Sequence, residues 1–230
     1  MNLREMMDAY SEEGLTRDLA AARVCQDIDL DFIHYALDDS SIRSFVQKLN
    51  CIDGIVIEMK DEIKELKHQD YHGKSIEVVI RDDSGNTVNS KIDIGVHKHL
   101  EIDQEEYCFD VCMDDEGATL LKNTVEQSFV EKLRSLLKFG SNSRRYKDIY
   151  DMFYLKDIIS RDKVLEIMDL LIFKDDGMFE NTVSDIVKRV TATFKDEQYL
   201  KRVSGSRQRW MDNDIHEIAD GIVAYLDSLK

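Results

Sequence analysis

The chain has 230 residues and a formal net charge of −16, with 43% hydrophobic and 34% charged residues. This composition excludes a disordered chain, and the negative charge argues against a protein that coats nucleic acid by neutralising phosphates. Since no apolar run approaches the roughly 20 residues of a membrane-spanning helix and the amino-terminal segment is not signal-like, we expect a folded cytoplasmic protein with no membrane partner.

The first 25 residues are expected to form two helices. Residues 2–10 and 16–25 carry helical spacing of apolar side chains. The pattern changes to that of a strand by about Asp27, although helix-to-strand connections usually take about 2 to 6 residues and favour glycine or asparagine at the helix exit. Neither residue type stands at this junction. We therefore expect an unusual connection there.

The next segment alternates acidic and aliphatic residues. Asp27, Asp29 and Asp31 are separated by Ile28 and Leu30. A strand repeats every two residues, so it would place all three acids on one face. Like charges this close repel unless a cation neutralises them or water screens them. Magnesium suits such a site, because it takes one or two carboxylates and completes its shell with water and phosphates. The alternative is an acidic edge strand that discourages association.

The middle of the chain is predicted to contain one helix and several strands. Ser40 or Ser41 can cap a helix that runs to about Asn50. Strand-like runs follow at 54–59, 75–80, 88–96 and 107–113. Asp93 falls near the end of the third run, which is a candidate neighbour of the first acidic strand. Such pairing would bring a further carboxylate to the same site.

The pattern becomes helical from Thr124 onward. The segment Thr124-Val125-Glu126-Gln127 fits a capping box. Further helices are expected at 164–173, 182–194 and 212–229, with Gly205 as a joint. The sequence therefore predicts α+β structure at the front of the chain and a helical bundle behind it.

The charge balance reverses locally between Thr124 and Lys147. Two acids, Glu126 and Glu131, stand here against six basic residues, Lys132, Arg134, Lys138, Arg144, Arg145 and Lys147. A basic surface facing an acidic strand is what a site for a nucleotide and a metal needs.

Together these residues indicate phosphoryl-transfer chemistry. Two acids on one strand and Asp93 on a neighbour are what two metal ions need to hold a triphosphate and activate an attacking hydroxyl. The third carboxylate commonly serves as base. Lys132 can neutralise charge that develops on the phosphates. Asp148 and Asp151 follow, one helical turn apart.

At these residues the chain resembles the AbiEii/AbiGii toxin family of nucleotidyltransferases, which belongs to the DNA polymerase β-like superfamily. The segment Asp29-Leu30-Asp31-Phe32 resembles the family's metal-binding signature, and Asp93 stands where the family has a further strand aspartate. Glu131-Lys132-Leu133 and the segment 145–151 resemble its downstream lysine and its arginine, lysine-aspartate segment.

The resemblance implies an α+β fold, with a small mixed β-sheet nucleotidyltransferase core at 1–121 and a C-terminal helical domain at 122–230. It implies transfer of a nucleoside monophosphate from an NTP to an acceptor hydroxyl, with two Mg²⁺ ions, a tRNA end as one candidate acceptor, and a cognate antitoxin protein as partner. The implied roles are catalytic for Asp93, Lys132 and Asp148, substrate binding for Arg144, Arg145 and Lys147, and metal binding for Asp27, Asp29, Asp31 and Asp93.

Two features of the resemblance leave alternatives open. The metal pair is Asp29 and Asp31 in one register and Asp27 and Asp29 in the other. Members of the superfamily also place a Gly-Gly or Gly-Ser turn before the acidic strand, where backbone N–H groups bind phosphates. Gly14 stands alone in this part of the chain, so we expect the segment with that turn to be absent near 25–27.

The alternative function is therefore a catalytically degenerate protein of the same fold that acts by binding a nucleotide, RNA or protein. A third interpretation is an α+β protein with a solvated acidic surface. The three differ in whether nucleotide and magnesium bind and whether transfer follows.

Overall fold

The computed structural model describes residues 28–32, 36–66, 73–96, 101–111 and 114–230. The chain divides into two compact units. The first unit consists of Met1–Leu100 and Cys108–Ala118, and the second unit consists of Glu101–Tyr107 and Thr119–Lys230. The last of these divisions falls between Ala118 and Thr119, three residues before the expected boundary after residue 121. The helices expected at 2–10 and 16–25, and the junction before Asp27, lie outside the described residues.

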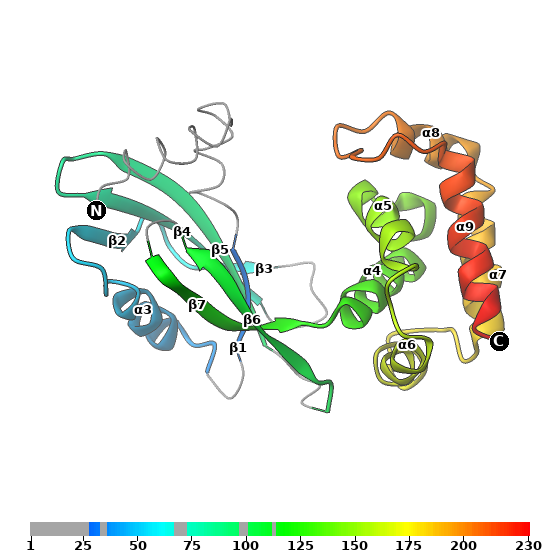
Figure 1. The fold of residues 1–230 in the computed structure, drawn as a ribbon, viewed down its shortest axis with the longest axis horizontal. Helices are drawn as coiled ribbons and strands as arrows, with labels where there is room; N and C mark the ends of the chain where they lie inside the picture. The colour runs from blue at the N-terminus through cyan, green and yellow to red at the C-terminus, as the bar shows by residue number, and fades with distance from the viewer. Residues whose placement is uncertain (1–27, 33–35, 67–72, 97–100, 112–113) are drawn as a thin grey trace. The chain divides into compact units, whose positions relative to one another are not determined.

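A mixed five-stranded sheet is the centre of the first unit (Figure 1). Its order is β1 (Ile28–Phe32), β5 (Thr87–Val96), β4 (Gly73–Asp82) and β2 (Ile55–Met59), and β3 (Lys64–Leu66) also pairs with β4. β1 runs parallel to β5, and the other pairs are antiparallel. The acidic strand and the strand that carries Asp93 are therefore neighbours, which confirms the pairing that the sequence suggested.

One face of this sheet is covered by α3 (Asp39–Lys48), because its apolar stripe packs on alternate residues of the strands. Ile42 and Val46 of the helix join Ile76, Ile92 and Ile94 in one buried cluster. Side chains of a strand alternate between faces, so the residues between these aliphatic positions lie on the other face. The core thereby decides which face carries the acids.

The cap of α3 differs from the expected one. Asp38, rather than Ser40 or Ser41, is the N-cap, and its Oδ1 accepts a hydrogen bond from the backbone N–H of Ser41 at 3.0 Å. The hydroxyl of Ser41 also donates to Asp38 Oδ2 at 2.7 Å. The hydroxyl of Ser40 also donates to Asp38 Oδ1, and the hydroxyls of Ser40 and Ser41 together hold the pKa of Asp38 well below its usual range.

A two-stranded sheet, β6 (Gln104–Val111) with β7 (Asp114–Asn123), follows along the chain. β6 begins three residues before the expected Tyr107. β7 was not predicted, because Asp, Glu and Gly dominate its first residues and disfavour strands.

The second unit is helical from α4 (Val125–Phe139) onward. The later helices are α5 (Tyr146–Leu155), α6 (Arg161–Met168), α7 (Val183–Phe194), α8 (Glu197–Ser204) and α9 (Ile215–Ser228). A 3₁₀ turn spans Gly140–Asn142, and a π-helical turn at Asp169–Phe173 extends α6. Thr124 caps α4 as expected, since its hydroxyl accepts from the backbone N–H of Gln127 at 3.1 Å. The reciprocal bond of a capping box is not made, because Gln127 Oε1 has no partner among the described residues and its Nε2 donates to Glu131.

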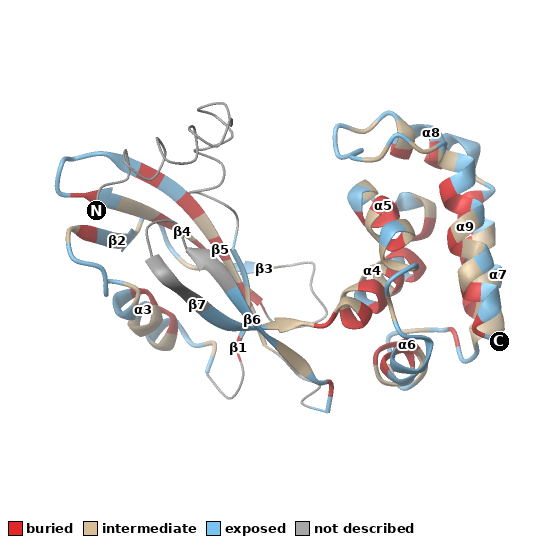
Figure 2. Ribbon diagram, in the orientation of Figure 1, coloured by how far each residue is buried: buried red, intermediate tan, exposed pale blue. Residues whose placement is uncertain are grey.

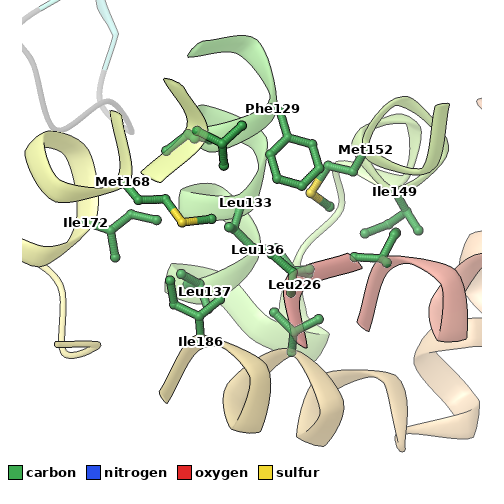
Figure 3. Packing of buried hydrophobic residues seen from close by; sticks show 14 of the residues in the cluster. Phe129, Leu133, Leu136, Leu137, Ile149, Met152, Met168, Ile172, Ile186 and Leu226 are labelled. Carbon is green, nitrogen blue, oxygen red and sulfur yellow. The ribbon is translucent and has the colours of Figure 1, made fainter. Parts of the chain in front are cut away.

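The core of this unit forms around α4. Figure 3 shows Phe129, Leu133 and Leu136 of α4 among Met152 of α5 and Met168 of α6, and Figure 2 shows the same buried side of the helix in red. Phe129 and Leu133 are fully buried. Because α4 packs on α5 on this side, its polar residues near α5 have fixed positions.

The fold class is α+β, with a small mixed sheet and helices toward the C-terminus, as predicted. None of the helices that the structure describes has the length and apolarity to span a bilayer.

Candidate functional site

The acidic residues of β1 and β5 meet in register. Asp29 lies opposite Asp93, and Asp31 lies opposite Gly95, in a parallel pair of strands. Partners at the same register of adjacent strands point to the same face. Since Ile92 lies in the α3 cluster, Asp29, Asp31 and Asp93 occupy the opposite face of the sheet. We call these three residues the acidic face.

Gly95 makes room for one of these carboxylates. A β-carbon added at Gly95 would clash with Asp31 Oδ1. Any side chain at this position would therefore displace the Asp31 carboxylate. Sequence reasoning gave Gly95 no role. The available signal was its place two residues after Asp93, on the same side of the same strand.

Asp93 is only partly neutralised. Its Oδ2 lies 2.5 Å from the ammonium nitrogen of Lys91, which precedes it on the same face of β5. Its Oδ1 is buried and has no hydrogen-bond partner among the described residues. A buried oxygen without a partner costs free energy unless a ligand, water or cation contacts it. The acidic face thus has one oxygen atom prepared to accept such a contact.

The donor set suits a hard cation. Carboxylate oxygens are the ligands that Mg²⁺ takes from proteins, usually one or two together with water and phosphate oxygens. Within the described part of the chain, no group of three His, Cys, Asp or Glu side chains is arranged to hold a metal ion. Asp27, one of the four predicted metal ligands, lies outside the described residues. The register of the metal pair therefore stays open.

The second unit contains a compact group of opposite charges, which we call the Lys132 cluster: Lys132, Arg145, Asp148 and Asp151. Lys132 Nζ lies 3.3 Å from Asp148 Oδ1 and 3.0 Å from Asp151 Oδ2. Arg145 Nε donates to Asp148 Oδ2 at 2.7 Å. α4 contributes the lysine, and the one-turn spacing on α5 places both aspartates on the side that packs against α4.

Lys132 and its two aspartates are largely shielded from water. The side chain of Lys132 is 22% exposed, and those of Asp148 and Asp151 are 10% and 16% exposed. Burial lowers the pKa of Lys132, but the two carboxylates raise it by more, so the net pKa lies above its usual value. The lysine is therefore held as an ammonium group.

The six basic residues between Thr124 and Lys147 do not form one continuous basic surface. Lys132 and Arg145 face the aspartates of the cluster. Arg134 instead pairs with Asp175, at 2.6 Å between its Nη2 and Asp175 Oδ2. The expected basic wall is therefore neutralised at Lys132 and Arg134 by acids further along the chain, whereas Arg145 pairs with Asp148 three residues later and stays 64% exposed.

The other predicted substrate-binding residues lie on the surface at the start of α5. Arg144 and Lys147 are exposed, and the side chain of Arg145 is 64% exposed despite its bond to Asp148. They remain accessible to a polyanion.

Trp210 was missed by sequence reasoning. Its indole N–H donates to Asp151 Oδ1 at 3.0 Å, although the two residues are 59 positions apart. Asp151 was noticed in the sequence without a role of its own. The signal that could have been followed is that this is the single tryptophan of the chain, in a polar segment between two helices.

A protein-family model described as "Nucleotidyl transferase AbiEii toxin, Type IV TA system" matches residues 18–218. The matched span contains the acidic face, the Lys132 cluster and Trp210. No curated protein matches the chain.

Proposed function

The chain belongs to the AbiEii family of nucleotidyl transferase toxins of type IV toxin-antitoxin systems, and from this premise we propose that it transfers a nucleoside monophosphate from an NTP to an acceptor hydroxyl. Pyrophosphate is the leaving group. The transfer depends on magnesium that the acidic face holds. The family supplies the reaction class, and the residues of this chain supply the assignment of roles.

The pairing of Asp29 with Asp93 supports this function most directly. Asp29 lies opposite Asp93 on paired strands, and Asp93 keeps a buried oxygen without a described partner. Repulsion between carboxylates raises the free energy of such a face. A bound cation would relieve that repulsion and could contact the buried oxygen, which supports a metal site at this face.

The acidic face has two functions in this proposal. Asp29, Asp31 and Asp93 would hold the two Mg²⁺ ions, which when bound polarise the phosphate oxygens and favour deprotonation of the attacking hydroxyl. Asp93 is also the candidate base, because its Oδ1 has no described partner while Lys91 contacts its Oδ2. Gly95 keeps the space that the Asp31 carboxylate occupies.

Lys132 is proposed to neutralise negative charge that develops on the phosphates during transfer. Its raised pKa keeps it charged through the neutral range, and Asp148 and Asp151 hold the ammonium group in place. Arg144, Arg145 and Lys147 provide exposed positive charge for the substrate. Lysine and arginine act here without any proton transfer of their own.

For the acceptor we propose a tRNA end, and for the biological role inhibition of growth that a cognate antitoxin relieves. Both follow from the family rather than from a contact in this chain. An acidic protein binds RNA only through local positive charge, which the exposed start of α5 supplies.

The test is transfer of a labelled nucleotide. The full chain is incubated with magnesium, each labelled NTP in turn and bulk tRNA, and compared with Asp29→Ala. We expect labelled RNA from at least one NTP, and loss of label and of growth inhibition in Asp29→Ala. Asp61→Ala, which removes an exposed carboxylate after β2, is the matched control and should behave as wild type.

Two results would contradict the proposal. One is the absence of product with every NTP together with undiminished toxicity of Asp29→Ala. The other is equal loss of transfer in Asp29→Ala and Asp61→Ala, which would trace the effect to surface charge. Binding of an NTP without turnover would instead favour the degenerate, binding-only alternative.

A further inference from the structure

The connection between α8 and α9 places an indole group against the Lys132 cluster. Trp210 Nε1 donates to Asp151 Oδ1 at 3.0 Å. The second oxygen of that carboxylate, Oδ2, lies 3.0 Å from Lys132 Nζ. A single carboxylate thus joins the tryptophan to the lysine, and it has one oxygen for each of them.

The segment around Trp210 is held by its own hydrogen bonds. Arg209 donates from Nε to the carbonyl of Met211 at 2.8 Å and from Nη2 to the carbonyl of Asp212 at 3.0 Å. Gln208 accepts from the backbone N–H of Lys147 at 3.3 Å. Since Lys147 lies in the first turn of α5, this last contact ties the segment to the helix that carries Asp151.

Burial accounts for little of what Trp210 does. The residue is 49% exposed, and its ring meets Tyr154 edge to face, with the ring centroids 5.7 Å apart. A half-exposed aromatic side chain contributes less to stability than a buried one. Its hydrogen bond is made to a carboxylate, and hydrogen bonds to charged groups are the stronger kind. The polar contact is therefore the specific one.

We propose that Trp210 is a positioning residue for Lys132. By holding Asp151 Oδ1, the indole keeps Oδ2 directed at the ammonium group. Without that donor, Asp151 is free to rotate, and Lys132 keeps only the longer contact to Asp148, at 3.3 Å. The effect on transfer rests on the proposed function, whereas the coupling between Trp210 and Lys132 is a property of the second unit alone.

The coupling can be tested without any assay of transfer. Because the chain has one tryptophan, the ¹⁵N-labelled full chain gives one tryptophan indole N–H signal in a proton–nitrogen correlation spectrum. We expect this signal to shift, and its hydrogen exchange to accelerate, in Asp151→Ala and also in Lys132→Met. Asp157→Ala, which removes a carboxylate that accepts from Lys156 instead, is the control and should leave the signal in place.

A signal that responds to Asp151→Ala but not to Lys132→Met would overturn the proposal, because the indole would then be insensitive to the lysine. A signal that responds to neither would overturn it as well. If Lys132→Met does not fold, Lys132→Arg replaces it, because a guanidinium keeps the positive charge but contacts Asp151 with a different geometry. This variant should still shift the indole N–H signal.

The positioning role has its own kinetic signature. Trp210→Phe keeps an aromatic ring and removes the donor. If Lys132 acts on charge that appears in the transition state, its displacement lowers kcat and kcat/KM together and leaves KM for the NTP nearly unchanged. We expect a loss of about tenfold in kcat, equivalent to about 1.4 kcal/mol.

Tyr154→Leu is the matched variant, because it removes the ring contact and retains the indole N–H. It should keep kcat within about twofold of wild type, well under 1 kcal/mol. Equal losses in Trp210→Phe and Tyr154→Leu, or an increase in KM alone, would assign Trp210 to ring packing and overturn the proposal. If the wild-type chain transfers no nucleotide, the proposed function fails, and the indole spectra still decide whether Trp210 and Lys132 are coupled.

Discussion

In the Lys132 cluster each aspartate faces a cation and a second donor, whereas on the acidic face Asp93 keeps one buried oxygen with no described partner. The charges of the Lys132 cluster are paired by residues from α4, α5 and the segment before α9. On the acidic face, Lys91 contacts one oxygen of Asp93, and Gly95 lies next to the Asp31 carboxylate. The comparison teaches that the charges of the Lys132 cluster are paired within the second unit, whereas the first unit keeps a buried carboxylate oxygen for which no partner is described.

This difference leads to opposite expectations for mutation. Removing a charge from the self-neutralised cluster leaves a buried charge of the other sign, which destabilises the fold itself. Changing the acidic face alters the response to a ligand and changes the stability of the free protein little.

The largest effect is expected for Lys132→Met, which keeps the length of the side chain and removes its charge. Asp148 and Asp151 would lose their shared cation in a largely buried setting, so we expect a loss of about 2 to 3 kcal/mol in the free energy of unfolding. Urea denaturation measures this loss. Lys163→Met, at an exposed position of α6, is the control and should cost less than about 0.5 kcal/mol. Equal effects would contradict the preorganised cluster.

A smaller effect with a different signature is expected for Gly95→Ala. The new β-carbon displaces the Asp31 carboxylate, which lies at the end of an exposed side chain and can rotate away at a cost below about 1 kcal/mol. Stability without ligand should therefore change little. Binding of magnesium with the NTP should weaken by at least about tenfold, or about 1.4 kcal/mol of ligand stabilisation.

The double variant distinguishes displacement of Asp31 from a general disturbance of β5. In an Asp31→Ala background, Gly95→Ala should have almost no further effect on ligand stabilisation, because the displaced carboxylate is already gone. Additive losses from the two substitutions would mean that Gly95 acts through something other than Asp31.

The smallest effect concerns alkaline pH. Burial lowers the pKa of Lys132, but the two aspartates raise it by more, so the folded pKa lies above the unfolded value of about 10.4. The folded state therefore binds this proton more tightly, and the resulting stability is fully present below about pH 10.4 and is lost as pH rises through the folded pKa. Wild type should lose its advantage over Lys132→Met in that range.

Comparing wild type with Lys132→Met removes the contribution of tyrosine titration to the loss of stability at alkaline pH. Burial also raises the pKa of Tyr150, Tyr199 and Tyr225, and these tyrosines are common to both proteins. Urea unfolding at a series of pH values from 8 upward gives the difference. A difference that stays constant across this range would contradict a raised pKa for Lys132.

The alternating acids and the neighbouring strand could be predicted from the sequence because both are local patterns of period two. The register that brings Asp29 opposite Asp93 depends on which face α3 covers, and the helix stripe at Ile42 and Val46 indicates only that one face is buried. Gly95 was missed because its role appears only when β1 lies beside β5.

In the second unit, the contacts that could not be predicted from the sequence join segments that are distant along the chain. In the sequence Arg134 belongs to a run of basic residues, whereas in the structure it pairs with Asp175, which follows the π-helical turn. In the sequence Trp210 has only the pattern of a loop residue, whereas in the structure it donates a hydrogen bond to Asp151. α8 was not predicted, since eight residues carry too short a pattern, and β7 was hidden by its acidic start.

The most direct test of the contrast is thermal unfolding of the full chain with magnesium alone and with magnesium plus each NTP, for wild type, Asp29→Ala and Asp61→Ala. At about 100 times its dissociation constant a ligand adds about 2.7 kcal/mol of stability. We predict an increase in Tm with at least one NTP in wild type and Asp61→Ala, and none in Asp29→Ala. An equal increase in all three proteins, or no increase with any NTP, would contradict a nucleotide and metal site on the acidic face.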